Sequence, residues 1–172
     1  MPTMIRTTTE SIDTLIRVEQ VTDAEFYAGD LFRRRFGSNP PDYPWHYVAL
    51  YKAARNSYVA VGYIHYIVFE DNCLCGGMVA DERALRRMPA THQAAVREGG
   101  GIVTKMLRDT CARYIGMPAI WVNGGDPSER DICARAGFLP TTDAHVMVRW
   151  NRDGPENERA AHLARIVALG PF

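Results

Sequence analysis

The stretch "VREGGGIVTKMLRDTCARY", residues 96–114, places three consecutive glycines directly before a helical pattern. From residue 102 to 115 apolar residues recur at helical spacing, and charged residues fall on the opposite face. Glycine costs about 1 kcal/mol relative to alanine inside a helix, so a glycine run needs a physical reason. Backbone N–H groups at a helix start carry partial positive charge, and glycines let an anion approach them. The pattern therefore predicts a phosphate or pyrophosphate site, with a flexible helix start as the alternative.

Two common phosphate motifs do not match this run. A Walker loop requires G-x-x-x-x-G-K-[ST], and no glycine stands directly before Lys105. A dinucleotide fingerprint requires G-x-G-x-x-G; Gly99 and Gly101 satisfy its first two glycines, but Thr104 occupies the third position. The strands expected before the run are also antiparallel hairpins, which do not open a doubly wound sheet.

Composition indicates a globular chain. Of 172 residues, 47% are hydrophobic and 23% charged, which predicts a single domain over residues 1–172 with residues 155–169 as a helical appendage. Lys plus Arg and Asp plus Glu both number 20, so we expect no nucleic-acid partner. The longest apolar stretch, residues 58–69, is too short to span a bilayer, and we expect a cytoplasmic protein without a membrane partner. The four cysteines lack metal-ligand spacing, so no metal is expected.

The element pattern predicts an α/β (α+β) fold. Residues 14–20 alternate as a strand, and Thr22 with Glu25 forms a capping-box pattern for a helix ending at Gly37. The further expected elements are strands 46–53, 57–71 and 72–81, helix-prone residues 82–98, helix 102–115, strand 118–125, helix 127–136 capped by Asp126, strand 145–150 and helix 155–169. The three central strands form an antiparallel meander, and a later strand–helix–strand unit adds a parallel pair. We therefore expect a single mixed, mostly antiparallel sheet flanked by helices.

Residues 58–150 resemble the GCN5-related N-acetyltransferase (GNAT) superfamily. The family fingerprint is [R/Q]-x-x-G-x-[G/A] between a strand and a long helix, and residues 98–103 align with it. Gly101 then matches the required glycine, while Glu98 and Val103 replace the Arg or Gln and the small residue. A shift by one residue gains Arg97 but disturbs the helix register. The run "ERDICARAGF", residues 129–138, resembles the later family helix that ends in Gly-Phe, and "GGMVAD", residues 76–81, resembles the cofactor strand.

The resemblance implies a GNAT-like acyl-CoA N-acyltransferase fold and acetyl-CoA (coenzyme A) as co-substrate. It implies an N-acetyltransferase in which the primary amine of a small molecule or peptide attacks the thioester directly in a ternary complex. Strands 72–81 and 118–124 would part to form the slot, and the Val79 N–H would stabilise the oxyanion. The implied cofactor-binding residues are Met78, Val79, Glu98, Gly99, Gly100, Gly101, Ile102, Val103 and Thr104.

Three residues are candidates for proton transfer. Cys133 stands where the family often has an acid tyrosine, and a thiol with an ordinary pKa of about 8.5 can protonate a thiolate. The alternative is that Cys133 fills the core. His65 and Glu82 are candidate general bases, against the alternatives of a sheet-facing histidine and a solvated helical face. Water is a further candidate for the base.

The acceptor side is the least defined. Tyr43 and Trp45 lie on a proline-rich loop and are candidate substrate-binding aromatics, with core-edge packing as the alternative. The last helix could pack on the sheet or on a second copy, so a homodimer stays open. A second hypothesis is a non-catalytic or weakly catalytic acyl-CoA-binding sensor of the same fold, and a third is a phosphate- or nucleotide-binding protein of unrelated fold.

Overall fold

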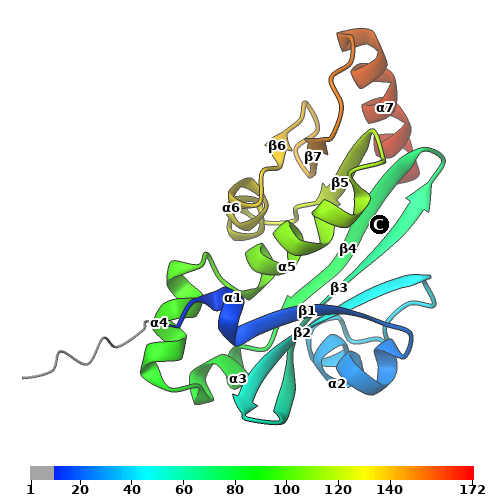
Figure 1. Ribbon diagram of the computed structural model, residues 1–172. Coiled ribbons are helices and arrows are strands. Elements are labelled where there is room, and N and C mark those ends of the chain that lie inside the picture. The colour runs from blue at the N-terminus through cyan, green and yellow to red at the C-terminus, as the bar shows by residue number, and fades with distance from the viewer. Residues whose placement is uncertain (1–9) are drawn as a thin grey trace, which may run out of the picture.

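A seven-stranded sheet in the order β1-β2-β3-β4-β5-β7-β6 organises the computed structural model, which describes residues 10–172 (Figure 1). The strands are β1 (Ile16–Val21), β2 (Trp45–Ala54), β3 (Ser57–Phe69), β4 (Asn72–Ala80), β5 (Ala119–Asn123), β6 (Leu139–Pro140) and β7 (Val146–Trp150). The helices are α1 (Ile12–Leu15), α2 (Ala24–Phe36), α3 (Glu82–Arg87), α4 (Ala90–Glu98), α5 (Ile102–Cys111), α6 (Pro127–Arg135) and α7 (Glu156–Leu169), with the 3-10 turn η1 (Ala112–Tyr114). Only β4 and β5 pair in parallel, so the predicted mixed, mostly antiparallel sheet flanked by helices is confirmed.

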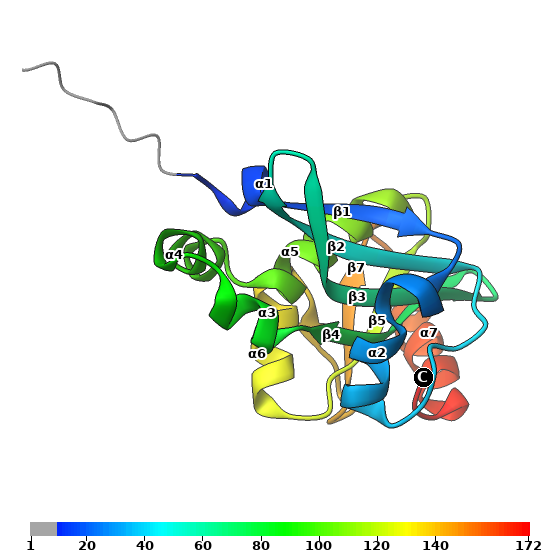
Figure 2. The same cartoon turned by 90° about the horizontal axis from the view of Figure 1, so that it is seen from below.

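The two faces of the sheet carry different helices. Cys73 and Cys75 of β4 point into the cluster that contains residues of α5 and α6. Leu74, between them, points into the opposite cluster with Ile166 of α7. Tyr63 of β3 packs with α2 on this second face. Because side chains alternate along a strand, α5 and α6 cover one face of the sheet, and α2 and α7 lie on the other (Figure 2).

Short polar residues set the helix ends. The predicted capping box of Thr22 and Glu25 does not form, because the Asp23 carboxylate accepts the Phe26 N–H at 2.8 Å and Glu25 pairs with Arg33. Gly37 ends α2 in the left-handed conformation at φ 74°, as predicted. Asp126 caps α6 by accepting the Glu129 N–H at 2.9 Å, which was also expected.

Residues 82–98 form two short helices rather than one. Pro89 stands between α3 and α4, and the residue before a proline avoids helical backbone, so α3 ends at Arg87. The side-chain amide of Gln93 donates to the carbonyl of Met88 at 2.9 Å and fixes the corner. α4 then packs against the one-turn helix α1. The sequence pattern indicated neither α1 nor the two-residue strand β6.

α7 packs on the sheet within this chain. Ile166 is fully buried in a cluster with Trp121 and Val148. Beneath it, the Trp121 indole N–H donates to the Asn72 side chain at 2.8 Å, and both residues are fully buried. Among residues 10–172, no helix is long and apolar enough to cross a membrane.

Replacing Ile166 with alanine tests whether α7 belongs to the core. We expect Ile166→Ala to lower the free energy of unfolding by about 2–5 kcal/mol, because it leaves a cavity over Trp121. Leu169→Ala, in the same helix but 43% exposed, should cost about 0.5 kcal/mol. Urea denaturation followed by tryptophan fluorescence measures both. Equal effects of the two variants would contradict the packing of α7.

Candidate functional site

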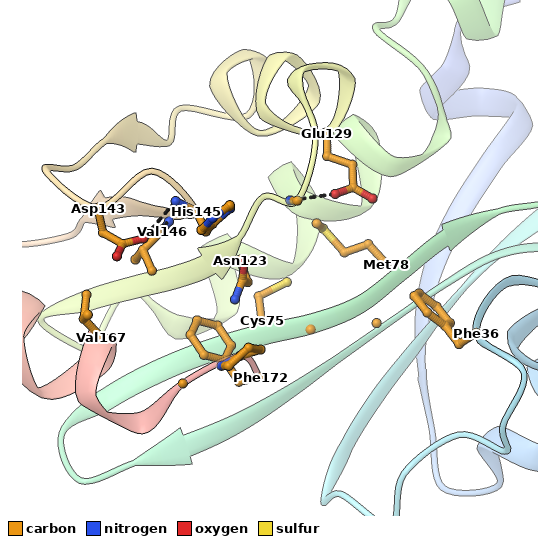
Figure 3. A pocket seen from close by; sticks show the side chains of 15 residues that line it. Phe36, Cys75, Met78, Asn123, Glu129, Asp143, His145, Val146, Val167 and Phe172 are labelled. Carbon is orange, nitrogen blue, oxygen red and sulfur yellow. Dashed lines mark hydrogen bonds between the residues drawn. The ribbon is translucent and has the colours of Figure 1, made fainter.

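The sheet divides into two halves between β4 and β5. The parallel pairing joins only residues 73–75 to residues 120–122. Beyond Cys75, β4 stays paired with β3 as far as Ala80. β5 instead stays with β7, and the Gly124 N–H donates to the carbonyl of His145 at 2.7 Å. The two strands therefore part and leave a cleft between them (Figure 3).

A β-bulge in β4 lies where the cleft opens. His65 pairs with Gly76 and Tyr63 with Val79, so two residues, Gly77 and Met78, oppose the single residue between His65 and Tyr63. Gly77 has φ 58°, and a Cβ there would stand 2.6 Å from Nδ1 of the His65 imidazole. Only glycine satisfies both the backbone conformation and the space. The bulge places bare main chain at the floor of the cleft.

The backbone direction of β4 corrects one prediction. The Asp81 N–H donates to the Val61 carbonyl at 2.8 Å, so it faces β3. N–H groups alternate sides along a strand, and the register is regular over Val79 and Ala80. The Val79 N–H therefore faces β3 and is not the oxyanion donor. The same alternation directs the N–H of Met78, the residue before Val79, away from β3.

One cavity, of about 570 Å³, lies between α2, α3, α5 and α6 beside this open edge of β4. Its lining includes Met78, Val79, Glu82, Arg83, Arg86 and Val103. Two ion pairs join α2 to its walls: Arg34 to Asp81 at 2.9 Å, and Arg35 to Glu129 at 3.0 Å. We call this space the α5-side cavity.

The start of α5 has free donors, but they are not those of the glycines. The N–H groups of Gly99, Gly100 and Gly101 donate to carbonyls of α4 at 2.9–3.0 Å and terminate that helix. Gly100 and Gly101 do so at φ 88° and 93°, which favours glycine. The N–H groups of Ile102, Val103 and Thr104 have no acceptor within the described chain. The Thr104 hydroxyl is also buried without a partner there.

Two residues of the predicted fingerprint lie differently. Glu98 ends α4 with an exposed side chain and does not line the α5-side cavity. Val103 does line it, with its branched side chain where the family has a small residue. Arg83 and Arg86 also line it, although the sequence pattern indicated only a solvated helix face. No local signal could have revealed their role, because it depends on where α3 packs.

A second cavity, of about 540 Å³, lies on the α2 and α7 face and shares Met78 and Glu129 with the first. We call it the α7-side cavity. Its walls include the apolar residues Phe36, Val146, Val167, Pro171 and Phe172 and the polar residues Asn123, Glu129, Asp143 and His145 (Figure 3). None of these residues was predicted from sequence to belong to a site; Met78, which also lines the cavity, was implied by the resemblance. They come from β5, α6, the loop before β7 and the chain after α7, which only the fold brings together.

Cys133 does not lie in the cleft. It is a residue of α6 and is fully buried in the core cluster that α6 shares with α5. Burial raises its pKa to about 12. It lines neither cavity. The structure therefore supports the alternative reading of Cys133 as core filling and contradicts its role as an acid.

Glu82 and His65, the candidate bases, lie on different sides of the site. Glu82 opens α3 with 82% of its side chain exposed and pairs with Arg86 at 3.4 Å, so it stands at the rim of the α5-side cavity. His65 lies under the bulge, 5% exposed, and its Nδ1 has no partner within residues 10–172. Burial, and then the neighbouring His46, lower the pKa of His65 to about 4. It is neutral at pH 7.

Tyr43 and Trp45 do not line either cavity. The Tyr43 ring packs edge-on against His65, with centroids 5.0 Å apart. Trp45 packs against Tyr114 at 5.9 Å, on the α5 face. The prediction that these aromatics contact substrate is therefore replaced by core-edge packing. Within residues 10–172, no group of three His, Cys, Asp or Glu side chains could hold a metal ion.

No family model matches the sequence, and no curated protein matches it. The structure of the ribosomal-protein-S18-alanine N-acetyltransferase from Escherichia coli is 14% identical, with 83% of this chain and 98% of that chain covered and a TM-score of 0.49. An acetyltransferase of the GNAT family from Staphylococcus aureus is 13% identical, with 80% and 99% covered and a TM-score of 0.49.

The low pKa of His65 predicts a pH dependence of stability. An unfolded histidine has a pKa of about 6.5, so between pH 6.5 and 4 the unfolded chain binds a proton that the folded chain does not. Stability should fall by about 3 kcal/mol as the pH decreases through this range, and His65 should contribute no slope above it. Urea denaturation at several pH values measures the slope.

The matched variants are His65→Gln and His145→Gln. The first should lose most of this slope, and the second, at an exposed histidine, should keep it. An NMR titration that gives His65 an ordinary pKa would contradict the buried, neutral imidazole.

Proposed function

We propose that this chain is a GNAT-type N-acyltransferase that transfers an acetyl group from acetyl-CoA to a primary amine by direct attack in a ternary complex. The observation that carries the proposal is the parting of β4 and β5 with two cavities along it, which meet at Met78 and Glu129. Such a cleft lets two reactants enter from separate cavities and meet at one strand edge.

The α5-side cavity suits the diphosphate and pantetheine of coenzyme A. The N–H groups of Ile102, Val103 and Thr104 and the positive end of the α5 dipole can hold an anion. Arg83 has no carboxylate partner within the described chain and can add charge. The open edge of β4, from the bulge to Ala80, can pair with the amides of the pantetheine arm as a further strand would.

The reaction needs little from side chains. Acetyl-CoA supplies an activated thioester. The Met78 N–H stands at the open edge of the bulge, where it can stabilise negative charge on the thioester oxygen. The amine nitrogen bonds to the acetyl carbon as the carbon–sulfur bond breaks; the amine gives up a proton and the thiolate takes one.

The proton that leaves the amine and the proton that the thiolate takes up must pass through water or through a residue that the sequence did not suggest. Cys133 is excluded by its burial. Glu82 stands on the side of the diphosphate, away from the amine. His65 is neutral and lies under the floor formed by Gly76 and Gly77, so it can accept a proton only through the open space beside the bulge.

The alternative is a non-catalytic or weakly catalytic acyl-CoA-binding sensor of the same fold. The branched side chain of Val103 in the α5-side cavity and the loss of Cys133 as an acid favour it. A cytoplasmic location, a single domain over the whole chain, the absence of a nucleic-acid or membrane partner and a homodimer stay predictions. Release of free thiol from acetyl-CoA on addition of amines separates an enzyme from a sensor.

Substitution at Val103 tests the binding of coenzyme A. We expect Val103→Asp to weaken binding by about tenfold or more, because its charge stands beside the diphosphate. An aspartate in the first helical turn favours the α5 dipole, so the variant should stay folded. Val103→Ala, which only removes bulk, should bind as tightly as the unchanged chain or more tightly. Isothermal titration calorimetry with coenzyme A measures all three.

Two results would count against the proposal. One is the absence of heat when the unchanged chain is titrated with millimolar coenzyme A. The other is equal affinity of Val103→Asp and Val103→Ala, since the diphosphate would then bind away from the start of α5.

A further inference from the structure

The α7-side cavity has a charge distribution that selects its occupant. Within the described chain its lining contains Glu129 and Asp143 and neither lysine nor arginine. The rest of the wall is largely apolar, from Phe36, Val146, Val167 and Phe172. A ligand with a carboxylate or phosphate would have no lysine or arginine to pair with here. An ammonium group on an apolar chain could pair with a carboxylate, while its carbon chain contacts the apolar wall.

The two carboxylates are not equivalent. Glu129 accepts the Gly125 N–H at 2.8 Å and pairs with Arg35 at 3.0 Å, so its charge is already balanced. Asp143 uses Oδ1 to accept the N–H groups of His145 at 2.8 Å and Val146 at 3.1 Å, which fixes its side chain. Its other oxygen, Oδ2, has no hydrogen-bond partner, and no cation pairs with Asp143 within residues 10–172.

The position of Asp143 separates it from the reacting centre. Figure 3 shows Asp143 beside Val167 at one end of the cavity and Met78 at the other, with Asn123 and His145 between them. A cation at Asp143 is therefore not the nitrogen that reacts beside Met78. The floor between the ends is the bare main chain of Gly76 and Gly77, and beneath it His65 keeps a buried Nδ1 without a partner in the described residues.

We propose that the acceptor is a diamine with an apolar spacer: Asp143 Oδ2 holds one ammonium group while the other nitrogen, as the free amine, reaches the acetyl group at Met78. This inference rests on the proposed function for the site's chemistry but concerns only the second ligand. Free amino acids and phosphorylated amines are disfavoured, because the end of the cavity where their acid group would lie carries a carboxylate.

Three six-carbon probes of equal length test this assignment: 1,6-diaminohexane, hexylamine and 6-aminohexanoate. They differ only at the far end, which is cationic, apolar or anionic. Isothermal titration calorimetry, with and without saturating coenzyme A, should rank affinity in that order. We expect about tenfold between the diamine and hexylamine, as for a charge-assisted hydrogen bond, and more for the amino acid.

Asp143→Asn is the matched variant, because its amide oxygen can still accept the N–H groups of His145 and Val146 while the charge is lost. In a thiol-release assay, which counts only the orientation that places an amine at Met78, it should abolish the advantage of the diamine over hexylamine and leave the turnover of hexylamine unchanged. Asp153→Asn removes an exposed charge outside the cavity and should keep the ranking. If thiol release is observed, the same change should raise KM for the diamine alone.

The outcomes separate the two proposals. Equal affinity for the diamine and 6-aminohexanoate, no diamine binding, or an unchanged ranking in Asp143→Asn would overturn the diamine assignment even if coenzyme A binds. Failure of coenzyme A to bind, with the diamine still ranked first and dependent on Asp143, would overturn the proposed function and leave the diamine site.

Discussion

The unpaired edge of β4 is the constraint on which the rest of the site depends. The backbone N–H and C=O groups of a strand need hydrogen-bond partners along both of its edges. Beyond Cys75, β4 has a neighbouring strand, β3, along one edge only. The bulge at Gly77 and Met78 turns the free edge into the cleft instead of toward β5. β5 cannot follow, because its end is tied to β7 through Gly124. An open edge inside a sheet is costly unless something pairs with it, and a ligand with amide groups is the partner this geometry accommodates.

The glycine run before α5 has a role different from that which the sequence suggested. Its amides close α4, and the positive φ angles of Gly100 and Gly101 reverse the chain so that α5 starts next to the cleft. The donors available to an anion belong to the three residues that follow. Gly100 and Gly101 thus act through their backbone conformation, which sets the direction of α5, and not through contact of their own N–H groups with a ligand.

The fold could be predicted from sequence largely because its signals are local. The apolar runs of β2 to β4 with the turns between them, the Asp126 cap and the Gly37 stop each depend on neighbouring residues, and all appear in the structure. The site could be predicted only in part. The strand pair and the start of α5 follow from a resemblance, but the walls of the α7-side cavity come from residues far apart in the sequence, such as Phe36, Asp143 and Val167. Cys133 was assigned by position in a motif, and burial decided against it.

The charges on the two sides of the cleft complement each other. The α5-side cavity has the positive end of a helix and Arg83 without a carboxylate partner in the described chain, which together attract an anionic cofactor. The α7-side cavity has Asp143 without a cation, which attracts an ammonium group. The pair Arg35–Glu129 lies at the junction and is neutral as a whole. The free N–H groups at the start of α5 and the free carboxylate oxygen of Asp143 therefore favour ligand groups of opposite charge at the two ends of the cleft. A side-chain acid is less necessary when both reactants are held at one bare strand edge.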